Sequence, residues 1–134
     1  MFLIDTSVLV PVLRNRPSSA KATFQAMVQE KPYYLSRLIQ TELLVGCKDK
    51  REWQLLTAYL DGQNYIEMKD SSWVGAARIY YDLRRVGYTV RSIIDCCIAQ
   101  LALEHDLILV HCDRDFESIA RVRGLECQYL SALE

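Results

Sequence analysis

The stretch Leu107-Ile108-Leu109-Val110-His111-Cys112-Asp113-Arg114-Asp115-Phe116 is the most informative part of this sequence. Its four leading aliphatic residues form the clearest strand pattern in the chain, because a short, continuous apolar run is typical of a buried strand. Two acids, Asp113 and Asp115, follow where the strand ends. The preceding segment, residues 93–104, is apolar on nearly all sides, as expected for a buried helix.

Similar strand patterns occur elsewhere in the chain, at residues 2–4, 33–35, 65–68 and 125–128. Helical spacing predicts helices at residues 8–13, 19–29, 38–45, 50–60 and 71–86, and a short one that ends near residue 122. The helix at 19–29 is expected to be capped by Ser18 or Ser19. Strands that alternate with helices imply a mostly parallel sheet, so we predict a single α/β domain over residues 1–134.

The charge balance argues against one class of nucleic-acid-binding protein. The 134 residues carry a formal net charge of −1, whereas proteins that coat nucleic acids are strongly basic. A nuclease remains compatible with this balance, because bound metal ions reverse the sign of a carboxylate pocket.

Cysteine usage and hydropathy predict a cytoplasmic location. The five cysteines are scattered and lack Cys-x-x-Cys spacing, so we interpret them as reduced thiols. Cys96 and Cys97 are consecutive on a helix and point in different directions, which does not favour a zinc site. Asp5 interrupts the apolar start too early for a signal peptide, and no apolar run approaches the roughly 18 residues of a membrane span.

Acidic residues stand at the ends of two predicted strands. Asp5 directly follows the first strand, and Asp113 and Asp115 follow the strand at 107–110. Ligands of open parallel sheets bind outside the carboxyl ends of the strands, so these positions suit a functional site. The alternative is structural, because each aspartate could equally cap the helix that follows it.

Glu42 lies on the same side of its predicted helix as Leu38 and Ile39. An unpaired carboxylate that faces a core costs several kcal/mol or becomes protonated. A metal ion at the rim of the core would remove that penalty. Alternatively, Glu42 flanks the apolar stripe and reaches solvent, or pairs with Arg37 or Lys48.

Asp95 lies in the opening turn of the most apolar helix. Ser92 stands three residues before it, which is the spacing of a capping box. Capping and function are compatible here, since the helix dipole also stabilises an anion at this end.

Together these acids make an oxygen-rich site suited to Mg²⁺ or Mn²⁺. Such ions bind a phosphodiester, lower the pKa of a bound water and neutralise charge on the leaving oxygen. Hydrolysis by water activated in this way should leave a 5′-phosphate and a 3′-hydroxyl. The sequence has no Gly-rich phosphate loop and no G-x-S-x-G motif. Its two histidines, His105 and His111, do not favour a histidine-based ribonuclease.

The order of these motifs resembles a PIN domain, and within that family the chain is similar to the VapC-type toxins of bacterial toxin–antitoxin pairs. The likeness covers essentially the whole chain. It implies a three-layer α/β/α fold and a Mg²⁺- or Mn²⁺-dependent endoribonuclease, with tRNA as the substrate that the family suggests. It also implies a homodimer, a cognate antitoxin whose tail blocks the site, and a higher assembly with that antitoxin.

The resemblance also implies residue roles. Asp5, Glu42, Asp95 and Asp113 match the acidic quartet of the family, and Thr6 or Ser7 matches a supporting hydroxyl. Asp5, Asp95 and Asp113 would be the metal ligands, and Glu42 would ligate the ion or orient the attacking water.

The match to the family pattern is less exact at three positions near the end of the strand at 107–110. Asp115 could substitute for Asp113 or assist it. His111-Cys112 departs from the family pattern, which often has Thr or Ser before the last acid.

Four arginines are candidates for contacts with RNA phosphates, namely Arg84, Arg85, Arg91 and Arg114. Tyr80, Tyr81 and Tyr88 could stack on bases. Acids balance the arginines of this segment, which favours a solvated face or a dimer contact as the default explanation. The main alternative to an enzyme is a PIN-like module without catalysis, which binds a partner protein through its acidic pocket.

Overall fold

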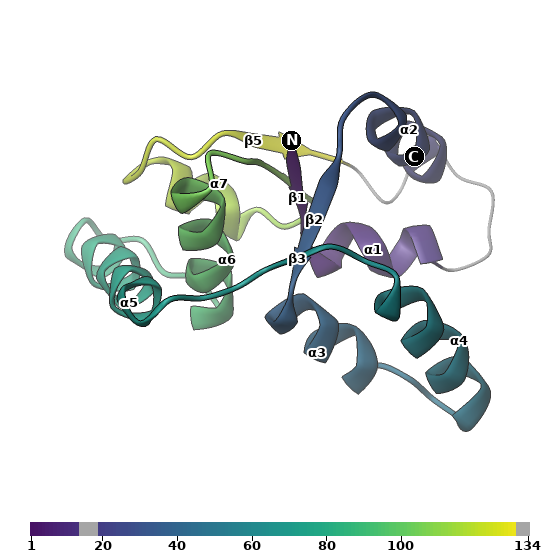
Figure 1. Ribbon diagram of the computed structural model, residues 1–134. Coiled ribbons are helices and arrows are strands. Elements are labelled where there is room, and N and C mark those ends of the chain that lie inside the picture. Colours follow the sequence, from purple (N-terminus) through teal and green to yellow (C-terminus); the bar gives the residue numbers. More distant parts are fainter. Residues whose placement is uncertain (14–18, 131–134) are drawn as a thin grey trace.

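The computed structural model describes residues 1–13 and 19–130, and Figure 1 shows how they are arranged. In chain order the elements are β1 (Phe2–Ile4), α1 (Thr6–Leu13), α2 (Ser19–Glu30), β2 (Tyr33–Ser36), α3 (Arg37–Val45), α4 (Lys50–Asp61), β3 (Tyr65–Ile66), α5 (Asp70–Arg85), α6 (Ile93–Glu104), β4 (Ile108–His111), α7 (Asp115–Ala120) and β5 (Cys127–Tyr129). Ser18, one of the two residues expected to cap α2, lies outside the described residues.

The strands form one sheet in the order β3-β2-β1-β4-β5, and every described pairing is parallel. Leu3 in the central strand is level with Tyr34 on one side and with Leu109 on the other. After β1 the chain builds β2 and β3 on one side and then returns to β4 on the opposite side of β1. The carboxyl ends of β1 and β4 therefore flank the topological switch point, which is where open parallel sheets bind ligands.

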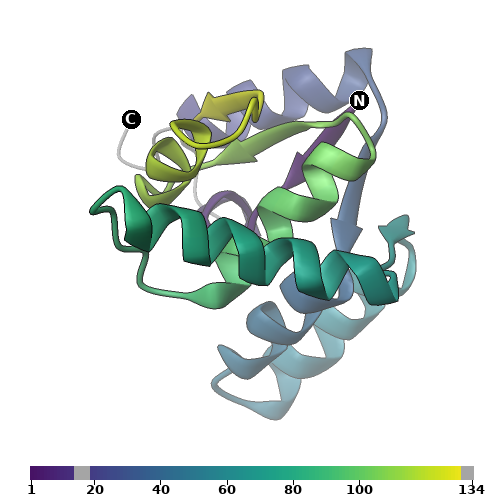
Figure 2. The same cartoon turned by 90° about the vertical axis from the view of Figure 1, so that its left-hand side faces the viewer.

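Helices cover both faces of the sheet, which confirms the predicted three-layer α/β/α class. In Figure 1, α5, α6 and α7 lie to the left of the strands, and α1, α2 and α4 lie to the right. Figure 2 shows α5 as the outermost helix on its side, running across α6. None of the helices in the described ranges is long and apolar enough to cross a membrane.

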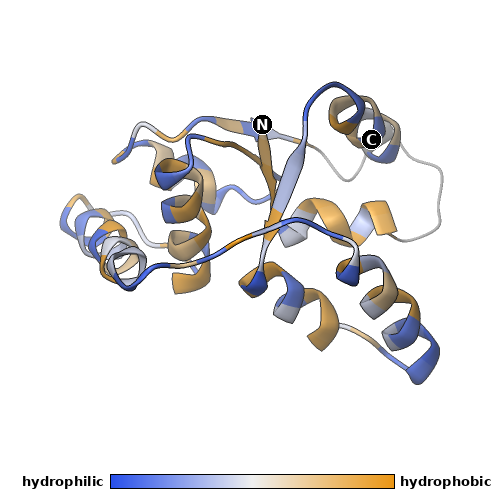
Figure 3. Cartoon of the chain, in the orientation of Figure 1, coloured by the Kyte–Doolittle hydropathy of each residue, from blue (hydrophilic) through white to orange (hydrophobic). Residues whose placement is uncertain are grey.

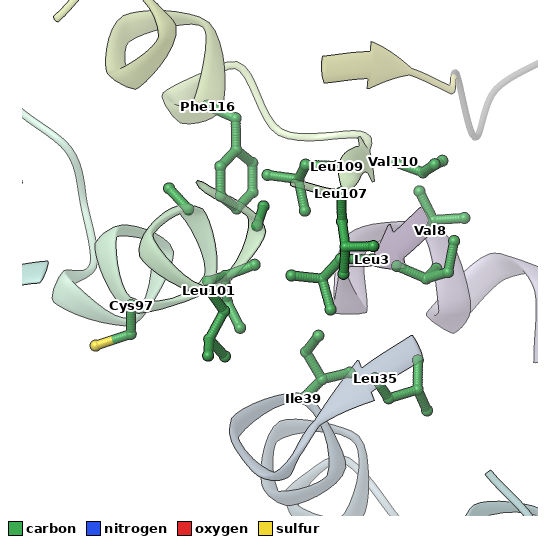
Figure 4. Close-up of a cluster of buried hydrophobic side chains, with 14 of the residues drawn as sticks. Leu3, Val8, Leu35, Ile39, Cys97, Leu101, Leu107, Leu109, Val110 and Phe116 are labelled. Carbon is green, nitrogen blue, oxygen red and sulfur yellow. The ribbon is translucent and has the colours of Figure 1, made fainter. Parts of the chain in front are cut away.

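The core lies where the central strands meet α6 and α7. Figure 3 shows apolar residues concentrated on β1, α1 and α6. Leu3, Leu109, Leu101 and Phe116 are fully buried and pack into the cluster of Figure 4. The helix predicted to be apolar on nearly all sides buries residues 96–99 together with Leu101 and Ala102, as expected from its composition.

Several element boundaries differ from the prediction. The strand expected at 65–68 covers only Tyr65–Ile66, because its partner β2 ends at Ser36 and the chain turns there into α3. The last strand is Cys127–Tyr129 rather than 125–128, and the helix expected to reach residue 122 ends at Ala120. The helix predicted from residue 71 begins at Asp70.

Candidate active site

Asp5 occupies the junction between β1 and α1. Its backbone N–H continues the sheet by donating to the carbonyl oxygen of Val110, 3.0 Å away. Its carboxylate oxygen Oδ2 accepts hydrogen bonds from the backbone N–H of Ser7 at 3.0 Å and from the Ser7 hydroxyl at 2.6 Å. The side chain therefore caps α1, as the structural interpretation expected, although the residue is only 4% exposed. Burial raises the pKa of Asp5, the Ser7 hydrogen bonds oppose this shift, and the charge of Asp113 adds to it.

Ser7 connects the ends of the two central strands. While its hydroxyl donates to Asp5, the same oxygen accepts a hydrogen bond of 2.9 Å from the backbone N–H of Cys112, directly after β4. This bond holds the loop that carries Asp113 next to the loop that carries Asp5. The sequence predicted Ser7 as a supporting residue but did not predict this bridge.

Asp113 is held in a tight turn after β4. Its backbone N–H donates to Nδ1 of His111 at 3.2 Å, and its Oδ1 accepts from the backbone N–H of Asp115 at 3.0 Å. His111 is 1% exposed and packs between the rings of Phe116 and Tyr129. Burial lowers the pKa of His111, which favours the neutral ring that Nδ1 needs as an acceptor. His111 thus shapes this corner, where the family pattern often has Thr or Ser.

Asp95 completes a cluster with the two acids that follow β4. Ligand oxygens of Asp95, Asp113 and Asp115 lie within 4.8 Å of one another. Burial raises the pKa of Asp95 to about 7, and the charges of Asp5, Asp113, Asp115 and Glu42 add to this shift. A carboxylate that titrates near neutral pH among four others is typical of a functional site.

The cap of α6 leaves the carboxylate of Asp95 unused. Ser92 is the N-cap and accepts from the backbone N–H of Ile94 at 3.1 Å. Across the described residues, no hydrogen bond uses the Asp95 side chain as an acceptor. The capping-box alternative therefore does not explain why an acid stands at this position.

Glu42 reaches the same region from α3. The hydroxyl of Thr6 donates to its Oε1 at 3.0 Å, across the junction after β1. Burial raises the pKa of Glu42, the Thr6 hydrogen bond opposes this, and the charge of Asp5 adds to it. Neither alternative pairing is found among the described residues: Arg37 pairs with Glu67, and no salt bridge joins Lys48 to Glu42.

Five carboxylates thus converge at the switch point, and the chemistry of this donor set fits a divalent cation. All the ligand atoms are hard carboxylate oxygens, the type preferred by Mg²⁺ and Mn²⁺. The pKa values of Asp5, Glu42 and Asp95 are all raised, so crowding these charges is unfavourable without added positive charge.

The predicted arginines divide into one that contacts the carboxylates and three that contact aromatic rings or other acids. Arg91 donates to Asp113 and to Asp115. Arg114 lies 3.7 Å from Glu117 and over the ring of Tyr129. The other two are on α5, where Arg84 lies over the ring of Tyr80 and Arg85 donates to the hydroxyl of Tyr81.

A mostly apolar groove, with Glu42 among its lining residues, was not predicted from the sequence. It has a volume of about 750 Å³ and lies between α1, α3 and α4. Leu13, Leu43, Leu56 and Tyr59 are among the residues that line it. The only sequence signal was the helical spacing of apolar residues in three separate segments, which does not reveal that the helices leave a space between them.

The motif order indicated a three-layer α/β/α fold with a parallel central sheet and with acids at the ends of β1 and β4, and the structure has this architecture. The family described as the PIN domain matches residues 2–122, and the chain belongs to this family. It is 36% identical over 129 residues to a protein named Ribonuclease VapC11 from Mycobacterium tuberculosis, covering 94% of this chain and 96% of that protein. Ribonuclease VapC51 from the same species is 30% identical, covering 96% and 92%.

Solved structures share the fold at lower sequence identity. VapBC2 from Rickettsia felis, bound to a DNA fragment from its promoter, matches with a TM-score of 0.78 and 18% identity, covering 96% of this chain and 97% of that one. FitAcB from Neisseria gonorrhoeae matches with a TM-score of 0.71 and 22% identity, covering 95% and 96%.

Proposed function

We propose that this protein is a metal-dependent endoribonuclease and the toxin of a toxin–antitoxin pair. The observation that carries the proposal is the convergence of five carboxylates at the switch point, with the pKa of Asp95 raised to about 7. Relatives that are 30–36% identical over nearly their whole length are named as VapC ribonucleases. Cytoplasmic RNA is the substrate that we infer for this chain.

Asp5, Asp95 and Asp113 are the proposed metal ligands, with Mg²⁺ as the first choice of ion and Mn²⁺ as the second. A divalent ion bound there would supply positive charge to the phosphodiester and acidify water. Glu42 would orient or deprotonate the attacking water, and Thr6 would hold its carboxylate by the 3.0 Å hydrogen bond. Ser7 would hold Asp5 and the loop after β4 in register.

The arginines at the rim would bind the backbone of the RNA. Arg114 follows Asp113 directly, and its side chain is 79% exposed, so it has the access that a phosphate contact requires. Arg84 and Arg85 on α5 would extend this contact further along the RNA. Their aromatic neighbours Tyr80 and Tyr81 offer stacking surfaces.

A cognate antitoxin and a second copy of the chain are the proposed protein partners. The groove beside Glu42 is a suitable surface for an antitoxin tail, because it is mostly apolar and Glu42, one of the five carboxylates, lines it. The acidic pocket would attract a basic side chain on that segment. Antitoxin binding would then block the site by occupying it.

The first experiment is cleavage of total RNA by the purified protein with Mg²⁺, Mn²⁺ or EDTA. We expect discrete fragments with 5′-phosphate and 3′-hydroxyl ends that require the metal and are lost in Asp5→Asn. Glu126→Gln is the matched control, because it removes one exposed carboxylate after β4 without touching the cluster. Products ending in a cyclic 2′,3′-phosphate would show that the 2′-hydroxyl attacks, and would refute hydrolysis by water.

If wild type and Asp5→Asn are equally inert while both are folded and bind metal, the protein is not a nuclease. The acidic pocket would then be a binding site for a partner protein, which is the alternative function. Sequencing the fragment ends of the active protein would identify the RNA and show whether it is a tRNA.

A further inference from the structure

Arg91 lies across the open side of the acidic cluster. Its backbone N–H and its Nε both donate to Oδ2 of Asp115, at 3.0 and 3.3 Å. Its Nη2 donates to Oδ1 of Asp113 at 3.0 Å. One guanidinium therefore bridges two of the three acids whose ligand atoms lie within 4.8 Å of one another.

Among the described residues, no other cation contacts the acidic cluster in the way that Arg91 does. The charges that shift the pKa of Asp95 are all carboxylates, and Arg91 is the only cation that forms a salt bridge with the cluster among the described residues. Its side chain is 80% exposed, whereas the side chains of Asp113 and Asp115 are 21% and 18% exposed. The arginine is therefore free to move away from acids that are themselves held in place.

We propose that Arg91 is a built-in counter-ion, which offsets part of the negative charge of the acidic cluster before a divalent ion binds and gives up Asp113 to that ion. The inference rests on the proposed function, because it requires that the cluster binds a divalent ion. It goes further by assigning opposite roles to neighbouring acids: Asp113 is exchanged between Arg91 and the ion, and Asp115 keeps Arg91 nearby.

The difference between the two acids follows from the atoms that contact them. Asp115 accepts from the backbone N–H of Arg91, and this bond survives when the side chain swings away. The only atom of Arg91 that donates to Asp113 is the terminal Nη2, which leaves with the guanidinium. A divalent ion carries twice the charge of the guanidinium, so at equal distance it attracts the carboxylate of Asp113 more strongly and competes with Arg91 for it.

Such a counter-ion would serve a protein that must fold before it is loaded with metal. Like charges at this separation repel one another, and a tethered cation reduces that repulsion without occupying the site permanently. The same contact lowers metal affinity, because the ion has to displace the arginine first.

The test measures the affinity for Mn²⁺ by calorimetry in wild type, Arg91→Gln and Arg78→Gln. Arg78→Gln is the matched control, since it removes the same charge from an exposed arginine whose partner, Asp82, lies outside the cluster. We expect Mn²⁺ to bind roughly five- to tenfold more tightly to Arg91→Gln than to wild type, and within about twofold of wild type in the control. In EDTA, Arg91→Gln should melt at a lower temperature than the control, and Mn²⁺ should raise its melting temperature by more than that of wild type.

A second measurement uses the wild-type protein and so does not depend on how the variants fold. In a ¹⁵N spectrum, the Nε–H signal of Arg91, assigned by its loss in Arg91→Lys, should shift towards the position of a free arginine as Mg²⁺ is added. The midpoint of that shift should match the midpoint of ion binding. A signal that does not change while the ion binds would overturn the proposal, as would equal or weaker Mn²⁺ binding by Arg91→Gln. A wild-type protein that binds neither ion would refute the metal dependence in the proposed function as well.

Discussion

Two junctions in this protein carry a strand directly into a helix, and they differ in the residue that makes the turn. At the end of β1, Asp5 caps α1 and accepts from the backbone N–H of Ser7 at 3.0 Å. At the end of β2, Ser36 caps α3 and accepts from the backbone N–H of Ile39 at 3.4 Å. Both caps are buried, with exposed fractions of 4% and 1%.

The comparison separates what the fold needs from what the site needs. Ser36 shows that a neutral hydroxyl is sufficient to cap a helix at the end of a buried strand. Asp5 caps α1 in the same way, but with a carboxyl group whose pKa is raised by burial and by the charge of Asp113. Because the cap does not require a charge, placing a carboxyl group at this buried position supports the proposed role of Asp5 as a metal ligand.

The largest predicted effect comes from making the first junction resemble the second. In Asp5→Ser the hydroxyl would keep a cap of the kind seen at Ser36, so the unfolding free energy should stay within about 1 kcal/mol of wild type. Metal-dependent RNA cleavage should fall by at least about a hundredfold, because a proposed ligand of the ion is lost. Urea unfolding in EDTA and a timed cleavage assay measure the two effects on the same preparation.

The reverse result would remove the contrast between the junctions. If Asp5→Ser loses several kcal/mol of stability and cleaves RNA at the wild-type rate, Asp5 is a structural cap and the site lies elsewhere. Loss of both stability and activity would be resolved by Asp5→Asn, which keeps the size of the side chain and its acceptor oxygen.

The next effect concerns the charge on Asp95, which lies at the same end of the sheet. Its pKa is about 7 in the folded protein and 3.8 as a free side chain, so the folded state binds a proton that the unfolded state has released between these pH values. The stability that Asp95 contributes is therefore full below about pH 4 and is lost as the pH rises towards 7. Metal-free Asp95→Asn should gain about 2 kcal/mol relative to wild type between pH 4.5 and pH 7.5, after allowing for solvent screening of a half-buried group.

This prediction is measured as a difference, because other groups titrate in the same range. Urea unfolding of both proteins in EDTA at several pH values gives the difference in unfolding free energy directly. A difference that does not change with pH would mean that the folded protein leaves the pKa of Asp95 near its ordinary value. Saturating Mg²⁺ should stabilise the wild type and should have little effect on Asp95→Asn.

The comparison of the junctions also shows which features the sequence could predict. The strand at 107–110 and the apolar helix at 93–104 are strongly patterned, so the fold class and the carboxyl-end positions of Asp5 and Asp113 followed from composition and order. The phase of a helix is harder to predict, so the sequence alone did not decide whether Glu42 faces the core or the solvent. The structure resolves this through the hydrogen bond from Thr6, which comes from a different element.

Contacts between distant segments could not be predicted from local patterns. Nothing around Ser7 indicates that its hydroxyl would accept from the backbone of Cys112, 105 positions away. The bridge from Arg91 to Asp113 and Asp115 likewise depends on how the loop before α6 lies against the loop after β4. The groove beside Glu42 depends on the packing of three helices.

A smaller effect is expected at the second junction. Ser36→Ala removes the side-chain cap of α3 and should lower the unfolding free energy by about 1 kcal/mol. Affinity for Mn²⁺ and the rate of RNA cleavage should change by less than about twofold, since the Ser36 side chain bonds the backbone N–H of Ile39 and none of the five carboxylates among the described residues. Ser36→Ala and Asp5→Ser would thus have opposite profiles, one losing stability and the other losing function. A loss of Mn²⁺ binding in Ser36→Ala would show that the two junctions are coupled through the sheet.

An effect of about the same size in free energy, but on the rate, is expected where the helices after the two junctions meet, at the hydrogen bond from Thr6 on α1 to Glu42 on α3. Thr6→Val keeps the shape of the side chain and removes the donor, which should slow cleavage by roughly three- to tenfold, the equivalent of one hydrogen bond. That bond lowers the pKa of Glu42 against the effect of burial, so without it the pKa rises further and the acid limb of the pH–rate profile moves to higher pH. Thr41→Val is the matched control, because its hydroxyl donates to the backbone of Arg37 on the exposed side of the same helix. Identical pH profiles for the two variants would mean that Glu42 acts without help from Thr6. The junction after β1 would then contribute only the carboxylate of Asp5 to the site.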